Sequence, residues 1–178
     1  GTLCVCAAGN SGRRGSLDFP AALPACVAVS AVGHVDWAPV GSWAHSHRLR
    51  RKDRTGRHGL FFSATSSYAK GVACTAPGVG IISTVPDRPR RKGQYMEMSG
   101  TSMATPAAAG ILALILSASA AYRKLPRGPA RAKLARKLLA RYCRSVGLHP
   151  MYQGRGLPAL RRVASAAIPR PAASSGAR

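Results

Sequence analysis

The sequence predicts an α/β domain in which a mostly parallel sheet is flanked by helices. Short apolar runs of strand length recur between Gly- and Pro-rich turns, and longer helical segments follow them. Because strands joined by helices or long connections usually pair in parallel, this order favours a layered α/β architecture. With 178 residues, 46% of them hydrophobic, the chain is long enough to form one domain around its own core.

The predicted strands lie in the first half of the chain. Residues 3–8 form an apolar run that stops at a Gly-Asn-Ser-Gly turn, and residues 25–32 form a second run after a Pro-rich lead-in. Residues 61–63, 72–75 and 81–84 are expected to be further short strands, since Gly and Pro separate them.

Three helices are predicted in the second half. Residues 102–121 are apolar and rich in small side chains, with Pro106 in the first turns, and we expect this helix to be buried on most sides. Residues 130–144 place Leu residues on one face and basic residues mostly off it, which predicts a surface helix that packs on the domain. Residues 156–167 are expected to form a last short helix. No run reaches the roughly 18 apolar residues of a membrane span, so no transmembrane segment is predicted.

One domain is expected over residues 1–168. Within it, residues 42–60 are rich in His, Arg and Lys and are predicted to be an exposed basic insertion that contributes nothing to the core. Residues 169–178 are expected to be a disordered tail. The chain starts Gly-Thr-Leu-Cys, without an initiator Met or a targeting signal, so we expect its first residue to be an interior point of a longer protein.

The chain is strongly basic. Lys and Arg number 27 against 5 acidic residues, for a formal charge of +22, which would attract nucleic acid, an anionic membrane or an acidic partner. A compositional bias of coding origin would give the same excess, and we favour it because the basic residues are dispersed as well as clustered.

The five cysteines follow no regular spacing. Cys4 and Cys6 would point to the same face of a strand, and no zinc-binding pattern surrounds them. We therefore expect them to be small buried hydrophobic residues.

A candidate nucleophile lies at the start of the long apolar helix. Acyl transfer needs a nucleophile placed where backbone amides can also receive the developing oxyanion, and a Ser at a helix N-terminus meets both needs. Ser102 lies in Ser99-Gly-Thr-Ser-Met-Ala-Thr-Pro106. Gly100 allows the backbone to come close to a substrate, and Thr101 begins the turn. An isolated Ser of this kind is usually a helix cap, but the eight-residue string is far more specific.

This string resembles the nucleophile motif of the subtilisin-like (S8 family) serine peptidases. A second segment, Ala7-Ala-Gly-Asn-Ser-Gly12, is similar to the family segment whose Asn donates to the oxyanion, although a turn role is the ordinary one for such an Asn. The resemblance covers about residues 3–167 and implies a three-layer subtilisin-like fold, incomplete at its N-terminus.

The resemblance also implies an activity and its residues. They are those of a serine endopeptidase that hydrolyses peptide bonds through an acyl-enzyme on Ser102, with Asn10 and the Ser102 amide as the oxyanion hole. A polypeptide would be the substrate. The implied substrate-binding residues are Ala7, Ala8, Gly9, Gly100 and Thr101. Family tendency implies a secreted or extracellular location, which the sequence itself does not indicate.

The sequence departs from the family pattern before Asn10. In the family the triad Asp and His precede this Asn, yet only nine residues precede Asn10, and none is acidic or His. The triad cannot be completed from this chain, so we expect it to be inactive alone and to need the missing N-terminal half of the domain as a partner. The histidines present are expected to be solvated and not to act as bases: His34, His45, His47, His58 and His149.

No cofactor and no metal site are predicted. Some relatives place acidic cation ligands before the Ala-Pro-Gly segment, whereas residues 71–75 contain none here. Calcium is therefore not expected, although the backbone carbonyls of Ala21 and Leu23 remain as family-type ligands.

A different class of function also fits the composition. The chain would then be a non-catalytic remnant or a basic binding module for polyanions, using residues 48–57 and 130–144 on nucleic acid or an acidic protein. The intact Ser102 and Asn10 motifs argue against long decay of a peptidase.

Overall fold

The computed structural model describes residues 2–37, 55–86 and 95–160. Its main sheet has four strands, β1 (Val5–Ala7), β2 (Val27–His34), β3 (Leu60–Phe62) and β4 (Val72–Pro77). β4 pairs in parallel with one edge of β2. On the other edge of β2, β1 pairs in parallel with the first residues of the strand, and β3 pairs antiparallel with its last residues. The prediction of a mostly parallel sheet thus holds for this sheet.

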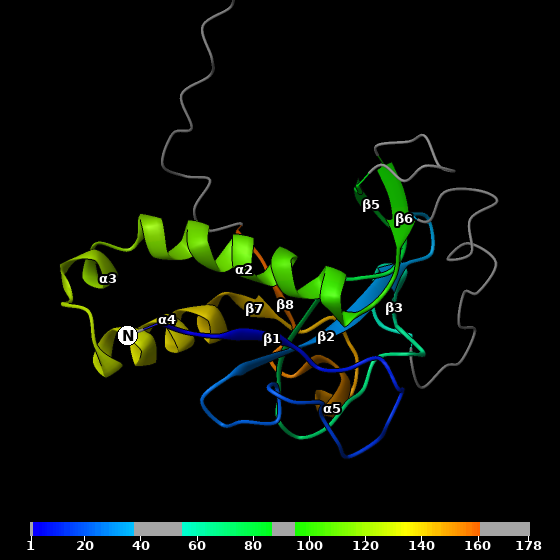
Figure 1. The fold of residues 1–178 in the computed structure, drawn as a ribbon, viewed down its shortest axis with the longest axis horizontal. Helices are drawn as coiled ribbons and strands as arrows, with labels where there is room; N and C mark the ends of the chain where they lie inside the picture. Colours follow the sequence, from blue (N-terminus) through cyan, green and yellow to red (C-terminus); the bar gives the residue numbers. More distant parts are fainter. Residues whose placement is uncertain (1, 38–54, 87–94, 161–178) are drawn as a thin grey trace, which may run out of the picture.

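Two smaller sheets are antiparallel. β5 (Ile81–Thr84) pairs with β6 (Tyr95–Met98), and β7 (Cys143–Arg144) pairs with β8 (Leu157–Pro158). In Figure 1 the β5–β6 pair lies beyond the N-terminal end of α2.

Four helices lie in the described part of the chain: α2 (Thr101–Ala118), α3 (Ala120–Lys124), α4 (Pro129–Tyr142) and α5 (Pro150–Gln153). The single helix predicted over residues 102–121 is wrong at its end. Ser119 adopts an extended conformation, and its hydroxyl accepts a hydrogen bond from the Tyr122 amide, so one residue ends α2 and caps α3.

The helix predicted over residues 156–167 is also wrong where it can be seen. Gly156 has a φ of +105°, and β8 follows it, with Leu157 paired to Arg144. Pro158, predicted to lie in the first turn of this helix, instead lies in β8 and pairs with Cys143 of β7. The rest of that range, like the tail 169–178, lies outside the described residues.

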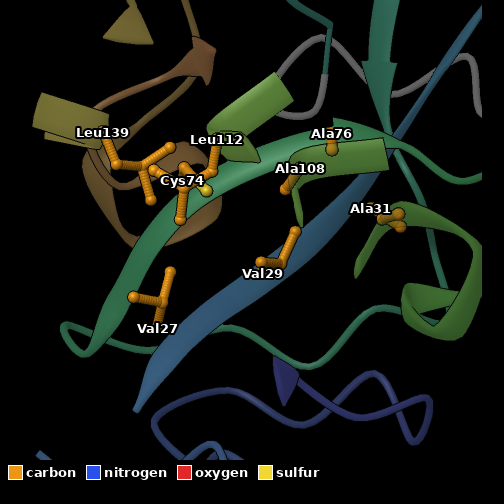
Figure 2. Close-up of a cluster of buried hydrophobic side chains, with 9 residues drawn as sticks. Val27, Val29, Ala31, Cys74, Ala76, Ala108, Leu112 and Leu139 are labelled. Atoms are coloured by element: carbon orange, nitrogen blue, oxygen red, sulfur yellow. The ribbon is translucent and has the colours of Figure 1, made fainter. Parts of the chain in front are cut away.

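The main core lies between the sheet and the two long helices. Alternate residues of β2, Val27, Val29 and Ala31, point to this side and meet Cys74 and Ala76 of β4 (Figure 2). Residues of α2 and α4 cover them: Ala104, Ala108, Leu112 and Leu139. The small residues of α2 allow the close approach to the sheet that the sequence predicted.

The opposite face of the sheet is covered differently. Val32 and Phe62 pack there with Tyr68 and with Tyr152 of the four-residue helix α5, whose carbonyl at Tyr152 accepts a hydrogen bond from Ser30 Oγ. Figure 1 shows α2 and α5 on opposite sides of β2. Within the described residues, the three-layer expectation is therefore met only in part, because no long helix covers this second face.

Cys4 and Cys6, expected to be buried, are exposed and half-buried respectively. Two further predictions about burial need correction. Leu60, inside the predicted insertion 42–60, is 7% exposed and belongs to the second cluster, because the Arg57 amide bonds to the Val146 carbonyl and holds the loop there. Residues 42–54 of that insertion all lie outside the described residues. The second correction concerns α2, whose buried residues lie on one face only. Leu114 on the outer side is 52% exposed.

α2 is also the one helix, among the described residues, with the length and apolar composition of a membrane span. It has 18 residues and a mean hydropathy of 1.6, and 28% of it is buried. Its inner face packs on β1, β2 and β4.

Candidate active site

The two sequence motifs, about 90 positions apart, meet in the structure. The Thr101 amide donates to Asn10 Oδ1 at 2.8 Å, and the Thr101 hydroxyl donates to the same oxygen at 3.0 Å. The Gly9 amide in turn donates to Thr101 Oγ1 at 3.3 Å. Thr101, fully buried, therefore joins the end of β1 to the start of α2.

The end of β1 sets the position of Asn10. Ala8, buried just beyond the strand, donates its amide to the Val29 carbonyl of β2 at 2.9 Å. Gly9 follows with a φ of +112°, and a side chain there would overlap the Asp18 carboxylate. Only glycine fits this turn without strain, and the turn brings Asn10 to the surface. Ala7, also predicted to border the substrate, is half-buried as the last residue of β1.

Two further glycines, Gly78 and Gly100, set the start of α2. The Gly100 amide donates to the Gly78 carbonyl at 2.7 Å, which ties the loop before α2 to the end of β4. A Cβ on Gly78 would lie 2.7 Å from the Gly100 carbonyl oxygen and 2.8 Å from Ala31 Cβ. Ser99 adds a further tie, because its hydroxyl accepts from the Gly80 amide at 2.9 Å.

Ser102 is the second residue of α2 and is exposed. In the described structure its hydroxyl has no hydrogen-bond partner. Its amide is one of the first-turn amides that a helix leaves unpaired, and no described group accepts from it. The α2 dipole adds partial positive charge at this point. An exposed hydroxyl therefore lies beside an unpaired donor at a positive helix end.

The orientation of the Asn10 carboxamide follows from its bonds. The Thr101 amide can only donate, so the Asn10 atom facing it must be Oδ1. Nδ2 is then directed away from Thr101 and remains available as a donor. Asn10 Nδ2 and the Ser102 amide are thus two donors held by one small network.

No base is placed at this site by the described residues. His34 stacks on Trp37 with ring centroids 4.6 Å apart, and His149 caps α5 by accepting from the Met151 amide. His58 lies in the turn before β3. His45 and His47 lie outside the described residues. Among the described residues, no three His, Cys, Asp or Glu side chains lie close enough together to hold a metal ion.

The sequence pattern of the subtilase family (peptidase S8) matches residues 1–139. The chain belongs to this family. Among curated relatives, this subtilase is 34% identical to the thermostable alkaline protease of Halalkalibacterium halodurans over 122 residues, which cover 68% of the chain and 26% of the relative. It is also 34% identical to the major intracellular serine protease of Bacillus subtilis over 145 residues, which cover 78% of the chain and 36% of the relative.

Solved subtilase-type structures agree with the fold. A lanthipeptide protease superposes with a TM-score of 0.58 at 21% identity, over 88% of this subtilase and 48% of that chain. A prenylagaramide maturation protease superposes with a TM-score of 0.57 at 22% identity, over 88% and 47% of the two chains. This subtilase thus spans about half the length of these two proteases, and 26% and 36% of the length of the two curated relatives.

The contacts that connect the two predicted segments could not be predicted from the sequence. Gly100 and Thr101, predicted to contact substrate, are buried, whereas Asn10 and Ser102 are exposed. The Gly78–Gly100 bond was not anticipated at all. The sequence signal for the buried Thr101 was its place between a Gly and the candidate nucleophile. The signal for the Gly78–Gly100 bond was the Gly of Ala76-Pro-Gly78.

Proposed function

We propose that this subtilase is part of a serine endopeptidase domain in which Ser102 forms the acyl-enzyme. The observation that carries the proposal is the double hydrogen bond from Thr101 to Asn10 Oδ1 beside the exposed Ser102. This arrangement gives an acyl-transfer site its nucleophile and its oxyanion donors together.

In the proposed reaction, Ser102 Oγ attacks the carbonyl carbon of a peptide bond and gives its proton to a base. The carbonyl oxygen becomes an oxyanion, which accepts from the Ser102 amide and Asn10 Nδ2. Because Thr101 holds Oδ1, the amide does not have to reorient as charge develops. Loss of one such donor costs about 10²–10³ in kcat, a magnitude established in subtilisin itself, a member of this family.

The base and its orienting carboxylate are proposed to come from polypeptide outside these 178 residues. The described histidines make their contacts elsewhere, and nothing acidic or His precedes Asn10. The matched protease structures are about twice as long, which leaves room for a complementary half. A serine hydroxyl without a base is a poor nucleophile, so this chain by itself should not hydrolyse peptides.

A fluorophosphonate probe on the longer gene product, or on this chain combined with the polypeptide that precedes it, tests the proposal. We expect one labelled site, lost in Ser102→Ala and retained in the neighbouring variant Ser99→Ala. Labelling that persists in Ser102→Ala would remove Ser102 as the nucleophile. The proposal also fails for the protein if the upstream reading frame encodes neither an Asp-Ser/Thr-Gly nor a His-Gly motif.

A polyanion-binding role remains the competing proposal, because of the charge of +22. Part of that charge already has a structural role: Arg136 donates to the carbonyls of Ala25 and Cys26, and Arg131 stacks over Tyr122 at 4.4 Å. Tight binding of nucleic acid that weakens steeply with salt, without probe labelling of the longer protein, would favour this role.

A further inference from the structure

Two of the five free thiols, separated by 69 positions in the sequence, meet in the core. Cys74 lies in the middle of β4 and is fully buried in the cluster beneath α2 (Figure 2). Cys143 is the first residue of β7, directly after α4, and packs half-buried against the same cluster. Each thiol lies close enough to the other to shift its pKa. The proposed peptidase function uses neither side chain.

Backbone hydrogen bonds hold these two thiols together. On either side of Cys74, the Ala73 carbonyl accepts from the Arg155 amide at 3.0 Å, and the Thr75 amide donates to the Gly156 carbonyl at 3.1 Å. The chain then continues into β8, where Pro158 pairs with Cys143. The two strands carrying the thiols are therefore connected through one short segment, which keeps the backbones of Cys74 and Cys143 near each other.

The two thiols differ in their surroundings. The hydrogen bond from Cys74, together with the positive charge of Arg155, lowers the pKa of the Cys143 thiol, against the opposing effect of its partial burial. The hydrogen bond with Cys143, together with burial, raises the pKa of the Cys74 thiol well above its usual value. The thiolate is the reactive form of cysteine, so Cys143 is the nucleophile of the pair.

Cys143 is also accessible to a small molecule. A hollow of about 120 Å³ lies against it, lined by Arg141, Tyr142, Arg144 and Ala159 as well. Hydrogen peroxide and small organic hydroperoxides are of a size to enter such a space, whereas Cys74 has no exposed surface. A reagent arriving from outside therefore meets Cys143 first.

We propose that Cys143 and Cys74 form a modification site at which a hydroperoxide converts two thiols into one disulfide. The Cys143 thiolate attacks the peroxide O–O bond, which gives the sulfenic acid and, with one proton, one molecule of water or alcohol. The Cys74 sulfur then displaces the sulfenic hydroxyl, which leaves with the Cys74 thiol proton as water. The two thiols lose two electrons to the peroxide in total, and a dithiol reductant reverses the change by thiol–disulfide exchange.

The remaining thiols provide an internal comparison. Burial, followed by the neighbouring Cys26 thiol, raises the pKa of Cys6, and no cation offsets these effects. The Val27 amide bonds to the Cys4 carbonyl, which keeps Cys4, Cys6 and Cys26 together at the start of β1 and β2. We expect Cys6 to be oxidised more slowly than Cys143.

The test uses the full 178-residue chain with the variant Cys4→Ser/Cys6→Ser/Cys26→Ser, which keeps only the proposed pair. Each protein is treated with a stoichiometric amount of hydrogen peroxide, blocked with N-ethylmaleimide and mapped by non-reducing peptide mass spectrometry. We expect a cross-link between Cys74 and Cys143 in both proteins, with free thiols falling from five to three in the unaltered chain. In Cys74→Ala, and in Cys74→Ser as a second variant, dimedone should trap a sulfenic acid at Cys143.

Three results would overturn the proposal. The first is oxidation of Cys6 before Cys143 in the unaltered chain. The second is the absence of the Cys74–Cys143 cross-link from the triple variant. The third is the same cross-linking rate in 6 M guanidinium as in buffer, since packing would then contribute nothing. The readout is thiol chemistry, so these results are independent of whether Ser102 is a nucleophile.

Discussion

The buried hydroxyl of Thr101 should contribute measurably to stability, and Thr101→Val isolates that contribution. The variant keeps the branched shape and the amide bond to Asn10, but it removes the hydroxyl that accepts from the Gly9 amide and donates to Asn10 Oδ1. Gly9 is buried, so its amide would lose its acceptor without gaining water. A buried donor left unsatisfied costs about 1–3 kcal/mol, and one lost hydrogen bond to Asn10 adds about 1 kcal/mol.

Urea unfolding of the chain, followed by circular dichroism, measures this loss. With a slope of about 2 kcal/mol per molar urea, a loss of about 2–4 kcal/mol lowers the unfolding midpoint by about 1–2 M. Thr105→Val is the matched control in the same helix. Its hydroxyl donates only to the Thr101 carbonyl, at 2.8 Å, and the side chain is half-buried. If Thr101→Val costs no more than Thr105→Val, the reasoning about the network is refuted.

Other variants test separate parts of the structure. Asn10→Asp keeps an acceptor for Thr101 but removes the Nδ2 donor, so acylation of the longer protein should slow by about 10²–10³ with little change in the urea midpoint; equal acylation would contradict the oxyanion role. Gly78→Ala should destabilise the chain, since its Cβ would lie 2.7 Å from a carbonyl oxygen, whereas Gly110→Ala meets no atom within 4 Å and should stabilise α2 by about 0.5–1 kcal/mol; the reverse order would contradict the steric argument. Leu112→Ala should cost about 2–5 kcal/mol by opening a cavity under α2, against a small change for the exposed Leu114→Ala; similar unfolding midpoints would mean that α2 is not packed as described.

Sequence patterns predicted those features that depend on local residue order. The strands at residues 25–32 and 72–75 and the helix at 130–144 came out within about two residues, because an apolar period and flanking Gly or Pro act locally. The proximity of Asn10 to Ser102 was predicted only through the resemblance of both motifs to one family. Nothing in the spacing of two segments about 90 residues apart specifies that they meet.

Features that depend on tertiary contacts were missed. Ser119 breaks the predicted long helix because its hydroxyl caps the next one, and Leu60 is buried because Arg57 is held by the Val146 carbonyl. Pro158 enters a strand pair instead of a helix, since Gly156 turns the chain beside Arg144. At Leu60 and Pro158 the conformation depends on partners distant in the sequence, whereas the cap at Ser119 is a local contact with Tyr122.

The outer face of α2 has a consequence for the chain in solution. Apolar residues there have no cover among the described residues, and such surfaces drive self-association. The formal charge of +22 opposes this, because equally charged chains repel one another at low ionic strength. Since the Debye length falls from about 30 Å at 0.01 M salt to about 3 Å at 1 M, added salt removes the repulsion and leaves the attraction. Colloidal stability of this basic subtilase should therefore decline as salt rises, the opposite of the salting-in often sought during purification.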